Sequence, residues 1–171
     1  VQNAMATWRD YMVSMGFGYA LGIDLPGEKR GMIPNDQYYD KAYNRSWNGL
    51  TIISISIGQG EVTATPLQIA NLGATIANRG YFITPHVVKE VEGDSLDSLY
   101  TQKRYTKVRR EHYETVVQGM RQAVLGGTCR GADLPGIEVC GKTGTAQNRG
   151  KDHSAFMGFA PMKEPKIRSE E

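Results

Sequence analysis

The ten residues from Gly136 to Thr145, GIEVCGKTGT, permit two local structures that exclude each other. The first eight satisfy the phosphate-binding pattern G-x-x-x-x-G-K-[ST], which requires a buried strand before the first glycine and a helix that begins at the lysine. The same residues also alternate as a β-strand does, with Ile137, Val139 and Gly141 on one face. The structure of this stretch therefore limits the architecture of the whole chain.

The neighbouring residues favour the strand. Ile137 and Val139 are β-branched and suit a strand better than a tight, flexible loop. Residues 130–135, RGADLP, are turn-like rather than a buried strand, and residues 143–145, TGT, favour extension over helix. No later apolar strand ends in an aspartate for magnesium. We expect an extended strand at a sheet border, with a P-loop nucleotide binder as the remote alternative.

Helix signals predict three helices, over residues 2–15, 65–80 and 111–125. The second has the clearest limits, because Thr65 and Gln68 complete a capping box around Pro66. The inward-facing residues expected on the second and third helices are Ile69, Leu72, Gly73, Ile76, Ala77, Tyr113, Val116, Val117, Met120 and Val124.

Two alternating segments, 137–145 and 154–160, lie on either side of a polar loop at 148–152, as in a β-hairpin. The apolar run 51–57 has the length of a strand, and 81–91 is strand-like but interrupted by Pro85. Residues 21–48 show turn signals and little periodicity, which predicts a loop-rich excursion. The fold class expected from these elements is α+β, an antiparallel sheet packed with helices.

Composition adds limits on the function. The chain has 171 residues, 40 % hydrophobic and 22 % charged, with a formal net charge of +2, so a polyanionic partner is not indicated and no nucleic acid is expected. The basic stretch 102–112 is interpreted as a solvated surface. No run approaches the roughly 20 apolar residues of a membrane span. Without an initiator methionine or a signal-peptide core, we expect a segment cut from a longer protein.

The cysteines and histidines predict no metal or cofactor site. Cys129 and Cys140 have no metal-ligand spacing, and whether they form a disulfide stays open, although Cys140 suits a small buried strand residue. His86 has no partner at ligand spacing and is interpreted as structural.

Several longer motifs together resemble one enzyme family. They are MGFG at 15–18, LGIDLPGE at 21–28, ISIGQGEVTATPLQIANLGATIANRGYFITPHVV at 55–88, GKTGTAQN at 141–148 and HSAFMGFAP at 153–161. In this order they resemble the later, C-terminal part of the transpeptidase domain of class B penicillin-binding proteins, of the penicillin-binding protein 2 type.

The resemblance implies a fold and an activity. The fold is that of the penicillin-binding transpeptidases and serine β-lactamases, here incomplete. The activity is that of a serine-type peptidoglycan D,D-transpeptidase, which crosslinks stem peptides in cell-wall synthesis and is acylated by β-lactams. The implied location is the periplasmic face of the inner membrane, with the anchor outside this chain and elongation proteins that maintain cell shape as partners.

Such sites combine S-x-x-K, S-x-N and K-T-G. Only the third is expected here, because no serine has a lysine three residues later. The triplet 46–48, SWN, follows MGFG instead of preceding it, so we interpret it as a surface turn before a strand. The neighbours Asp152, His153 and Ser154 cannot form a hydrolytic relay, since adjacent strand residues point to opposite faces.

The resemblance assigns roles to the K-T-G strand. Lys142 is the catalytic cation that assists proton movement, and it also binds substrate. Thr143 and Thr145 contact the terminal carboxylate region, the Thr145 N–H forms half of the oxyanion hole, and Gly144 permits close approach. The nucleophile and general base are expected outside the chain.

The end of the chain departs from the family pattern. We expect residues 1–167 to be a transpeptidase fragment and 168–171, RSEE, to be a non-family tail. The sheet should then lack its last strand and the helix that covers it, which predicts an exposed apolar edge and poor independent stability.

Two alternative functions remain testable. A non-catalytic interaction module derived from a transpeptidase predicts that the upstream coding sequence lacks S-x-x-K. A nucleotide binder predicts ATP affinity that depends on Lys142.

We expect no ATP binding by the parent chain or by Lys142→Ala in a calorimetric titration. Binding by the parent that Lys142→Ala abolishes would establish the phosphate-binding interpretation instead.

Overall fold

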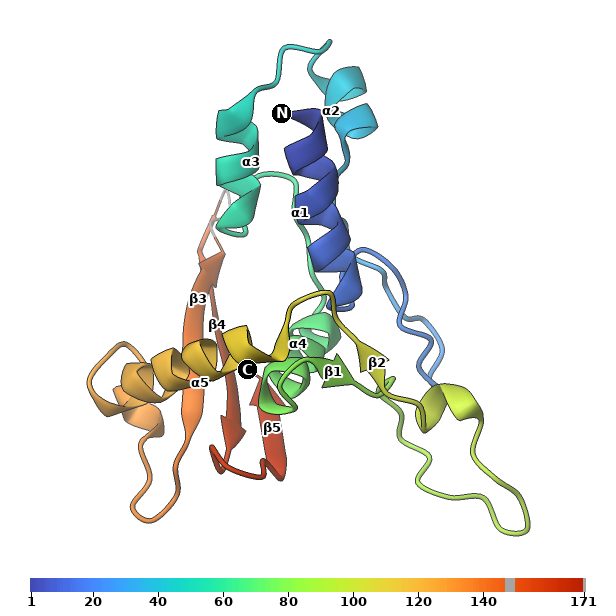
Figure 1. Ribbon diagram of the computed structural model, residues 1–171, viewed down its shortest axis with the longest axis vertical. Helices are drawn as coiled ribbons and strands as arrows, with labels where there is room; N and C mark the ends of the chain where they lie inside the picture. The colour runs from blue at the N-terminus through green and yellow to red at the C-terminus, as the bar shows by residue number, and fades with distance from the viewer. Residues whose placement is uncertain (147–149, 171) are drawn as a thin grey trace.

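The computed structural model describes residues 1–146 and 150–170 of the chain. Figure 1 shows α1, α2 and α3 at one end and a three-stranded sheet with α4 and α5 at the other. The elements are α1 Gln2–Ser14, α2 Asp36–Ala42, α3 Gly49–Ser56, α4 Pro66–Ala77, β1 Tyr81–Phe82, the 3-10 helix η1 Ser98–Tyr100, β2 Arg104–Tyr105, α5 Arg110–Leu125, the 3-10 helix η2 Arg130–Ala132, β3 Cys140–Ala146, β4 His153–Ala160 and β5 Ile167–Glu170.

The main sheet is antiparallel, with the strand order β3-β4-β5. The predicted hairpin is confirmed: β3 and β4 pair from Cys140↔Phe159 to Ala146↔His153. Part of the loop expected at 148–152 lies outside the described residues, because 148 and 149 are not described. Within the described chain β3 forms one border of this sheet, so one edge of its backbone has no strand partner.

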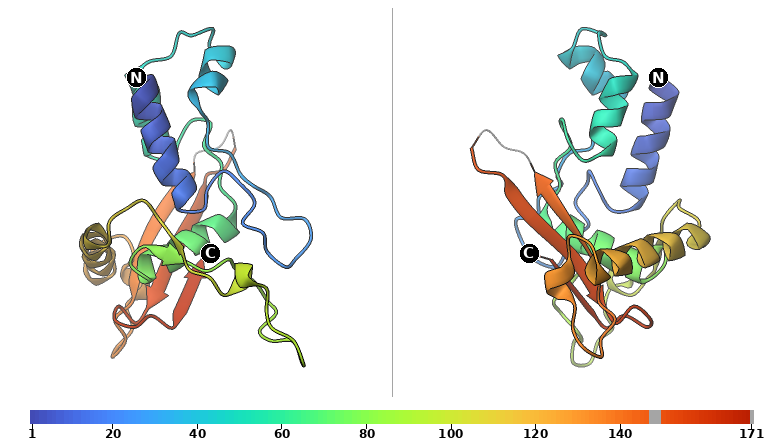
Figure 2. Two further views of the ribbon diagram at one scale, coloured as in Figure 1. Left: turned by 45° about the vertical axis from the view of Figure 1, so that its right-hand side comes forward. Right: turned by 90° about the vertical axis from the view of Figure 1, so that its left-hand side faces the viewer.

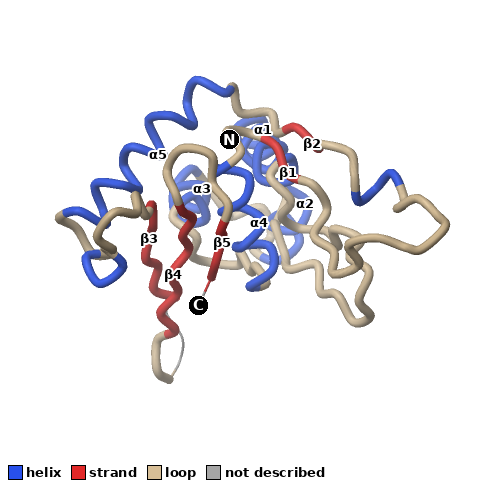
Figure 3. The backbone as a smooth tube through the Cα atoms, turned by 90° about the horizontal axis from the view of Figure 1, so that it is seen from below, coloured by secondary structure: helices blue, strands red, loops and turns tan. Residues whose placement is uncertain are grey.

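Helices α4 and α5 cover one face of the sheet (Figures 2 and 3). Cys140 and Phe159, which are register partners, are buried there with residues of both helices. The helix residues in this core are Ile76, Ala77, Tyr113, Val117 and Met120. Gly73 lets α4 approach closely, since a Cβ at that position would lie 3.1 Å from Met157 Cγ.

The opposite face of the hairpin carries a further apolar cluster. Val124, Cys129 and Val139 are buried there, and Phe156 packs against them. Cys129 and Cys140 are therefore in separate clusters, and both are free thiols.

The helices at the other end share a second core, and one of them corrects the sequence interpretation. Met5 from α1, Tyr39 from α2 and Ile55 from α3 are buried together. The run 51–57 was expected to be a strand but lies almost wholly in α3. Asn48 accepts a hydrogen bond from Leu50 N as the N-cap, and Ile55 is buried in this core from α3. Capping and tertiary packing therefore outweigh β-branched composition.

Three further expectations are also wrong. Residues 36–42 form α2 inside the expected loop, because Asn35 caps the helix by accepting from Tyr38 N. Only Tyr81–Phe82 of the segment 81–91 is a strand, and its partner is β2. Val116, expected inward, is 46 % exposed, because the buried stripe of α5 runs through Tyr113, Val117, Met120 and Val124.

The chain end also differs from expectation. Residues Ile167–Glu170 pair with Met157–Ala160 of β4, so the sheet has a further strand after residue 165. The donation of Lys166 N to Ala160 O, at 2.9 Å, closes the turn that brings the chain back. Backbone pairing needs no apolar sequence, which explains why a polar end can form a strand. The proposed domain limit at residue 167 remains a prediction.

Gln68 joins α4 to the loops that precede it. The predicted capping box is present, with Gln68 N donating to Thr65 Oγ1 and Thr65 N donating to Gln68 Oε1. The Gln68 side chain is also 1 % exposed, and its Nε2 lies within hydrogen-bond distance of three backbone carbonyl oxygens. These acceptors belong to Gly16, Tyr19 and Arg30, at 3.2, 3.1 and 2.9 Å.

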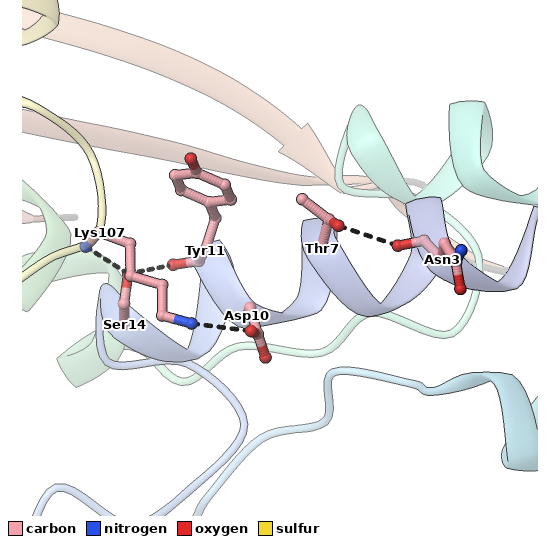
Figure 4. A network of polar contacts seen from close by, with 6 residues as sticks. All are labelled: Asn3, Thr7, Asp10, Tyr11, Ser14 and Lys107. Carbon is pink, nitrogen blue, oxygen red and sulfur yellow. Dashed lines mark hydrogen bonds and ion pairs between the residues drawn. The ribbon is translucent and has the colours of Figure 1, made fainter.

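Polar contacts tie α1 to the segment before α5 (Figure 4). Lys107 Nζ lies 2.7 Å from Asp10 Oδ2, and Lys107 N donates to Ser14 Oγ. The hydrogen bond and the charge of Lys107 lower the pKa of Asp10. Nearby, Lys103 and Arg104 lie over the Tyr81 and Tyr19 rings. The basic stretch 102–112 is therefore engaged with the protein's own acidic and aromatic side chains.

We expect Gln68→Met to lower the free energy of unfolding by about 3 kcal/mol, because it leaves buried carbonyl groups without a donor. Urea denaturation followed by circular dichroism measures this. Gln118→Met, at an exposed position on α5, is the matched control and should change stability by less than about 0.5 kcal/mol. Equal effects of the two substitutions would contradict the role assigned to Gln68.

Candidate functional site

The four residues Lys142, Thr143, Gly144 and Thr145 lie consecutively on the border strand β3. Their register partners on β4 are Met157, Phe156, Ala155 and Ser154. Lys142, Gly144 and Thr145 are exposed, and Thr143 is half-buried. The structure thus presents the predicted K-T-G residues on an accessible strand and anchors that strand at Cys140.

Lys142 and Thr143 each make a side-chain hydrogen bond. Lys142 Nζ donates to Thr143 O at 2.5 Å, so the ammonium group lies against its own strand. The Thr143 hydroxyl lies 2.8 Å from the hydroxyl of Thr128, and either oxygen can be the donor. The motif gives no signal for Thr128, which lies fifteen residues earlier in a glycine-containing turn.

The two glycines of β3 differ in their surroundings. A Cβ on Gly141 would lie 2.6 Å from Phe156 Cε2, because the phenyl ring covers this position. A Cβ on Gly144 would meet no atom of the described residues within 4 Å. Gly141 therefore allows the sheet to pack, whereas Gly144 leaves the strand surface open to an approaching molecule.

The extended conformation decides between the two interpretations of GIEVCGKTGT. Residues 140–146 continue as strand through the lysine and threonines, and no helix begins at Lys142. The amide groups here take part in a sheet ladder and do not converge on one point, so the geometry of a phosphate-binding loop is absent from this described segment.

The S-x-N triplet at 46–48 serves the local structure. Asn48 caps α3, and Trp47 Nε1 donates to Asp40 Oδ1 at 2.7 Å. The expected strand after it is wrong, as α3 shows, but the interpretation as a surface turn agrees with these contacts.

Of the neighbours Asp152, His153 and Ser154, the last two begin strand β4. His153 and Ser154 are successive residues of β4, facing Ala146 and Thr145 in the register. His86 has structural contacts, since its Nδ1 lies 2.8 Å from Thr84 O and its ring lies 5.0 Å from the Tyr100 ring at a tilt of 39°.

A second polar cluster lies among the helices α1 to α3 and the segment after them. Both oxygens of Glu61 accept hydrogen bonds at 2.5 Å, one from the Tyr39 hydroxyl and one from the Tyr43 hydroxyl. Burial opposes ionisation of Glu61, but the two hydroxyls and a backbone hydrogen bond together outweigh it, so the pKa of the carboxyl group is lowered. The cluster connects α2 to the segment before α4.

The described residues offer no metal centre and no reactive thiol. No group of three histidine, cysteine, aspartate or glutamate side chains within them could hold a metal ion. Burial raises the pKa of the Cys140 thiol, which keeps it protonated and poorly nucleophilic.

Comparison with known proteins identifies the family of this chain. Residues 2–168 match the family described as penicillin binding protein transpeptidase domain. This chain belongs to that transpeptidase family. The match covers all the elements from α1 to the start of β5, and it includes the K-T-G strand.

Individual transpeptidases agree with this assignment. The chain is 34 % identical to a peptidoglycan D,D-transpeptidase MrdA of Acinetobacter baumannii, over 97 % of this chain and 28 % of that protein. It is 30 % identical to the peptidoglycan D,D-transpeptidase PbpA of Mycobacterium tuberculosis, over 98 % of this chain and 34 % of that protein. The chain therefore spans about a third or less of the relatives it matches.

Solved transpeptidase structures have the same fold. A crystal structure of Pseudomonas aeruginosa PBP2 in complex with WCK 5153 superposes with a TM-score of 0.83 at 30 % identity, over 96 % of this chain and 36 % of that one. A complex of PBP2 and MreC from Helicobacter pylori gives a TM-score of 0.77 at 26 % identity, over 95 % and 30 % of the two chains. The α+β transpeptidase fold expected from the sequence is confirmed.

The two glycines give a matched test of the transpeptidase strand. We expect Gly141→Ala to lower the free energy of unfolding by about 1–2 kcal/mol, because the Phe156 ring must move away from the new methyl group. Gly144→Ala, in open space on the same strand, should change stability by less than about 0.5 kcal/mol. Urea denaturation of both variants measures the difference. A loss at Gly144 equal to that at Gly141 would contradict the packing described.

Proposed function

We propose that this chain is part of a peptidoglycan D,D-transpeptidase, which crosslinks cell-wall stem peptides by serine acyl transfer and is acylated by β-lactams. One observation carries the proposal: Lys142-Thr143-Gly144-Thr145 occupies an accessible border strand in a chain that matches the transpeptidase family over residues 2–168. The names of the relatives, peptidoglycan D,D-transpeptidases, support the same reaction.

The border strand β3 suits an extended peptide substrate. A strand edge with free N–H and C=O groups can accept a peptide as an additional strand. In this proposal Gly144 lets the substrate backbone lie close, and the open space around it supports that role. The N–H of Thr145 supplies one donor of an oxyanion hole for the tetrahedral intermediate.

In this proposal, side chains of the same strand bind the negatively charged group of the substrate and assist proton transfer. The hydroxyl groups of Thr143 and Thr145 donate to the terminal carboxylate region of the substrate in this proposal. Lys142 provides a cation that assists proton transfer and attracts the substrate anion. Its contact with Thr143 O engages only one of its three N–H donors, so the ammonium group retains capacity for other acceptors.

The nucleophile belongs to other residues of the complete enzyme in this proposal. No serine of the sequence precedes a lysine by three positions, so the chain has no S-x-x-K motif. The border strand then binds and orients the substrate, and a serine from outside the 171 residues attacks it.

The location and partners follow the relatives. No helix of the described residues has the length and apolar character to cross a bilayer. We place the enzyme at the periplasmic face of the inner membrane, with elongation proteins as partners. The Helicobacter pylori PBP2 was solved in complex with MreC, which supports a partner of this kind.

The complete gene product tests the proposal. We expect a fluorescent penicillin to label it covalently at one site, and Lys142→Ala to reduce the second-order labelling rate by about 100-fold or more, because general acid–base assistance is lost. Absence of labelling in the parent protein would overturn the proposed function.

The 171-residue chain by itself should show no covalent labelling, because it lacks the S-x-x-K serine. Mass spectrometry after incubation with benzylpenicillin measures this. Stoichiometric acylation of the chain alone would show that the nucleophile lies within these residues.

A further inference from the structure

We infer that Thr128 is a positioning residue that orients the Thr143 hydroxyl toward the substrate carboxylate. The inference rests on the proposed function and adds a residue to its site. The two hydroxyl oxygens are 2.8 Å apart, although one residue lies in the turn after α5 and the other on β3.

The backbone around Thr128 is held on both sides. Gly127 N and Cys129 N both donate to Ala123 O, at 3.1 and 3.0 Å. A Cβ on Gly127 would lie 2.9 Å from the Ala123 backbone, so the turn approaches the helix more closely than a side chain would allow. Cys129 is buried beside Val124 and Val139. The backbone that carries the Thr128 side chain is therefore held against the end of α5.

The position of Thr143 is fixed independently. Thr143 pairs with Phe156 in the β3–β4 ladder, two residues beyond Gly141, where the phenyl ring covers the sheet. Two separately anchored segments thus bring their hydroxyl groups together. Thr143 itself stays half-buried and Thr128 exposed, so a ligand on the strand can reach this pair.

The chemistry of a hydroxyl group makes the contact directional. Each hydroxyl has one O–H donor and two acceptor lone pairs. If Thr143 donates to Thr128, only lone pairs of Thr143 remain for a ligand, and they repel a carboxylate. If Thr128 donates to Thr143, the Thr143 O–H is free to donate to the carboxylate. The anion selects the second arrangement, in which the two hydrogen bonds polarise and strengthen each other.

The experiment compares Thr128→Val, which removes the hydroxyl at similar volume, with Thr128→Ser, which retains it. In the complete gene product, we expect Thr128→Val to lower the second-order acylation rate with benzylpenicillin about 3- to 10-fold. Thr128→Ser should restore most of that rate. Thr115→Val, the same change at an exposed position on α5, is the control for the substitution itself.

Two further measurements separate orientation from a structural effect. With benzylpenicillin methyl ester, which lacks the carboxylate, Thr128→Val and the parent protein should react at equal rates. In a Thr143→Val background, adding Thr128→Val should cause no further loss, because the group it orients is gone. Both results would support the positioning role.

Other results of these experiments would contradict the positioning role of Thr128. An unchanged rate for Thr128→Val, an equal loss for Thr128→Ser, or an equal loss with the ester would overturn the inference and leave the proposed function intact. Failure of the parent protein to react with benzylpenicillin would overturn both together.

Discussion

The packing of Cys140 against Phe159, register partners buried below α4 and α5, anchors one end of the β3–β4 hairpin. The positions of the later residues of β3 depend on this packing. The strand leaves the core after Gly141 and is exposed from Lys142 onward except at Thr143. A buried end supplies the free energy that holds the strand extended, and the exposed end presents charge and hydroxyl groups on a defined backbone. The proposed chemistry therefore relies on a core that contains none of the residues assigned to it.

Strand β3 shows that the residues around a short motif decide which structure the motif forms. Eight letters of the sequence satisfy a phosphate-binding pattern, yet the backbone they form is a sheet ladder. The Phe156 ring requires Gly141, while no described residue lies close enough to Gly144 to require a missing side chain there. A glycine with open space around it at a strand border lets another molecule approach the backbone closely. This reasoning supports a peptide-binding strand as strongly as the motif does.

Sequence reasoning succeeded where signals are local. The capping box of Thr65 and Gln68 and the alternation in the hairpin depend on near neighbours, and both predictions are confirmed. It failed at α3, where β-branched residues indicated a strand but the Asn48 cap and the core around Ile55 impose a helix. The Thr128–Thr143 contact could not be predicted from the sequence, because the two residues meet only once α5 and β3 have packed together. Local patterns report local structure, and the candidate site was found mainly through its motif.

The side-chain amide of Gln68 has a consequence for the order in which the chain acquires its structure. Its three carbonyl acceptors lie 52, 49 and 38 residues away along the chain, so each contact closes a long loop. Closing a long loop lowers the conformational entropy before the contact contributes favourable free energy. Topologies rich in such contacts therefore fold slowly. Helix α4 can form early from its own capping signals, whereas the loops that contain Gly16, Tyr19 and Arg30 must wait for that helix. During synthesis on the ribosome these loops emerge first, and water hydrates their carbonyl groups until the glutamine leaves the exit tunnel and replaces it.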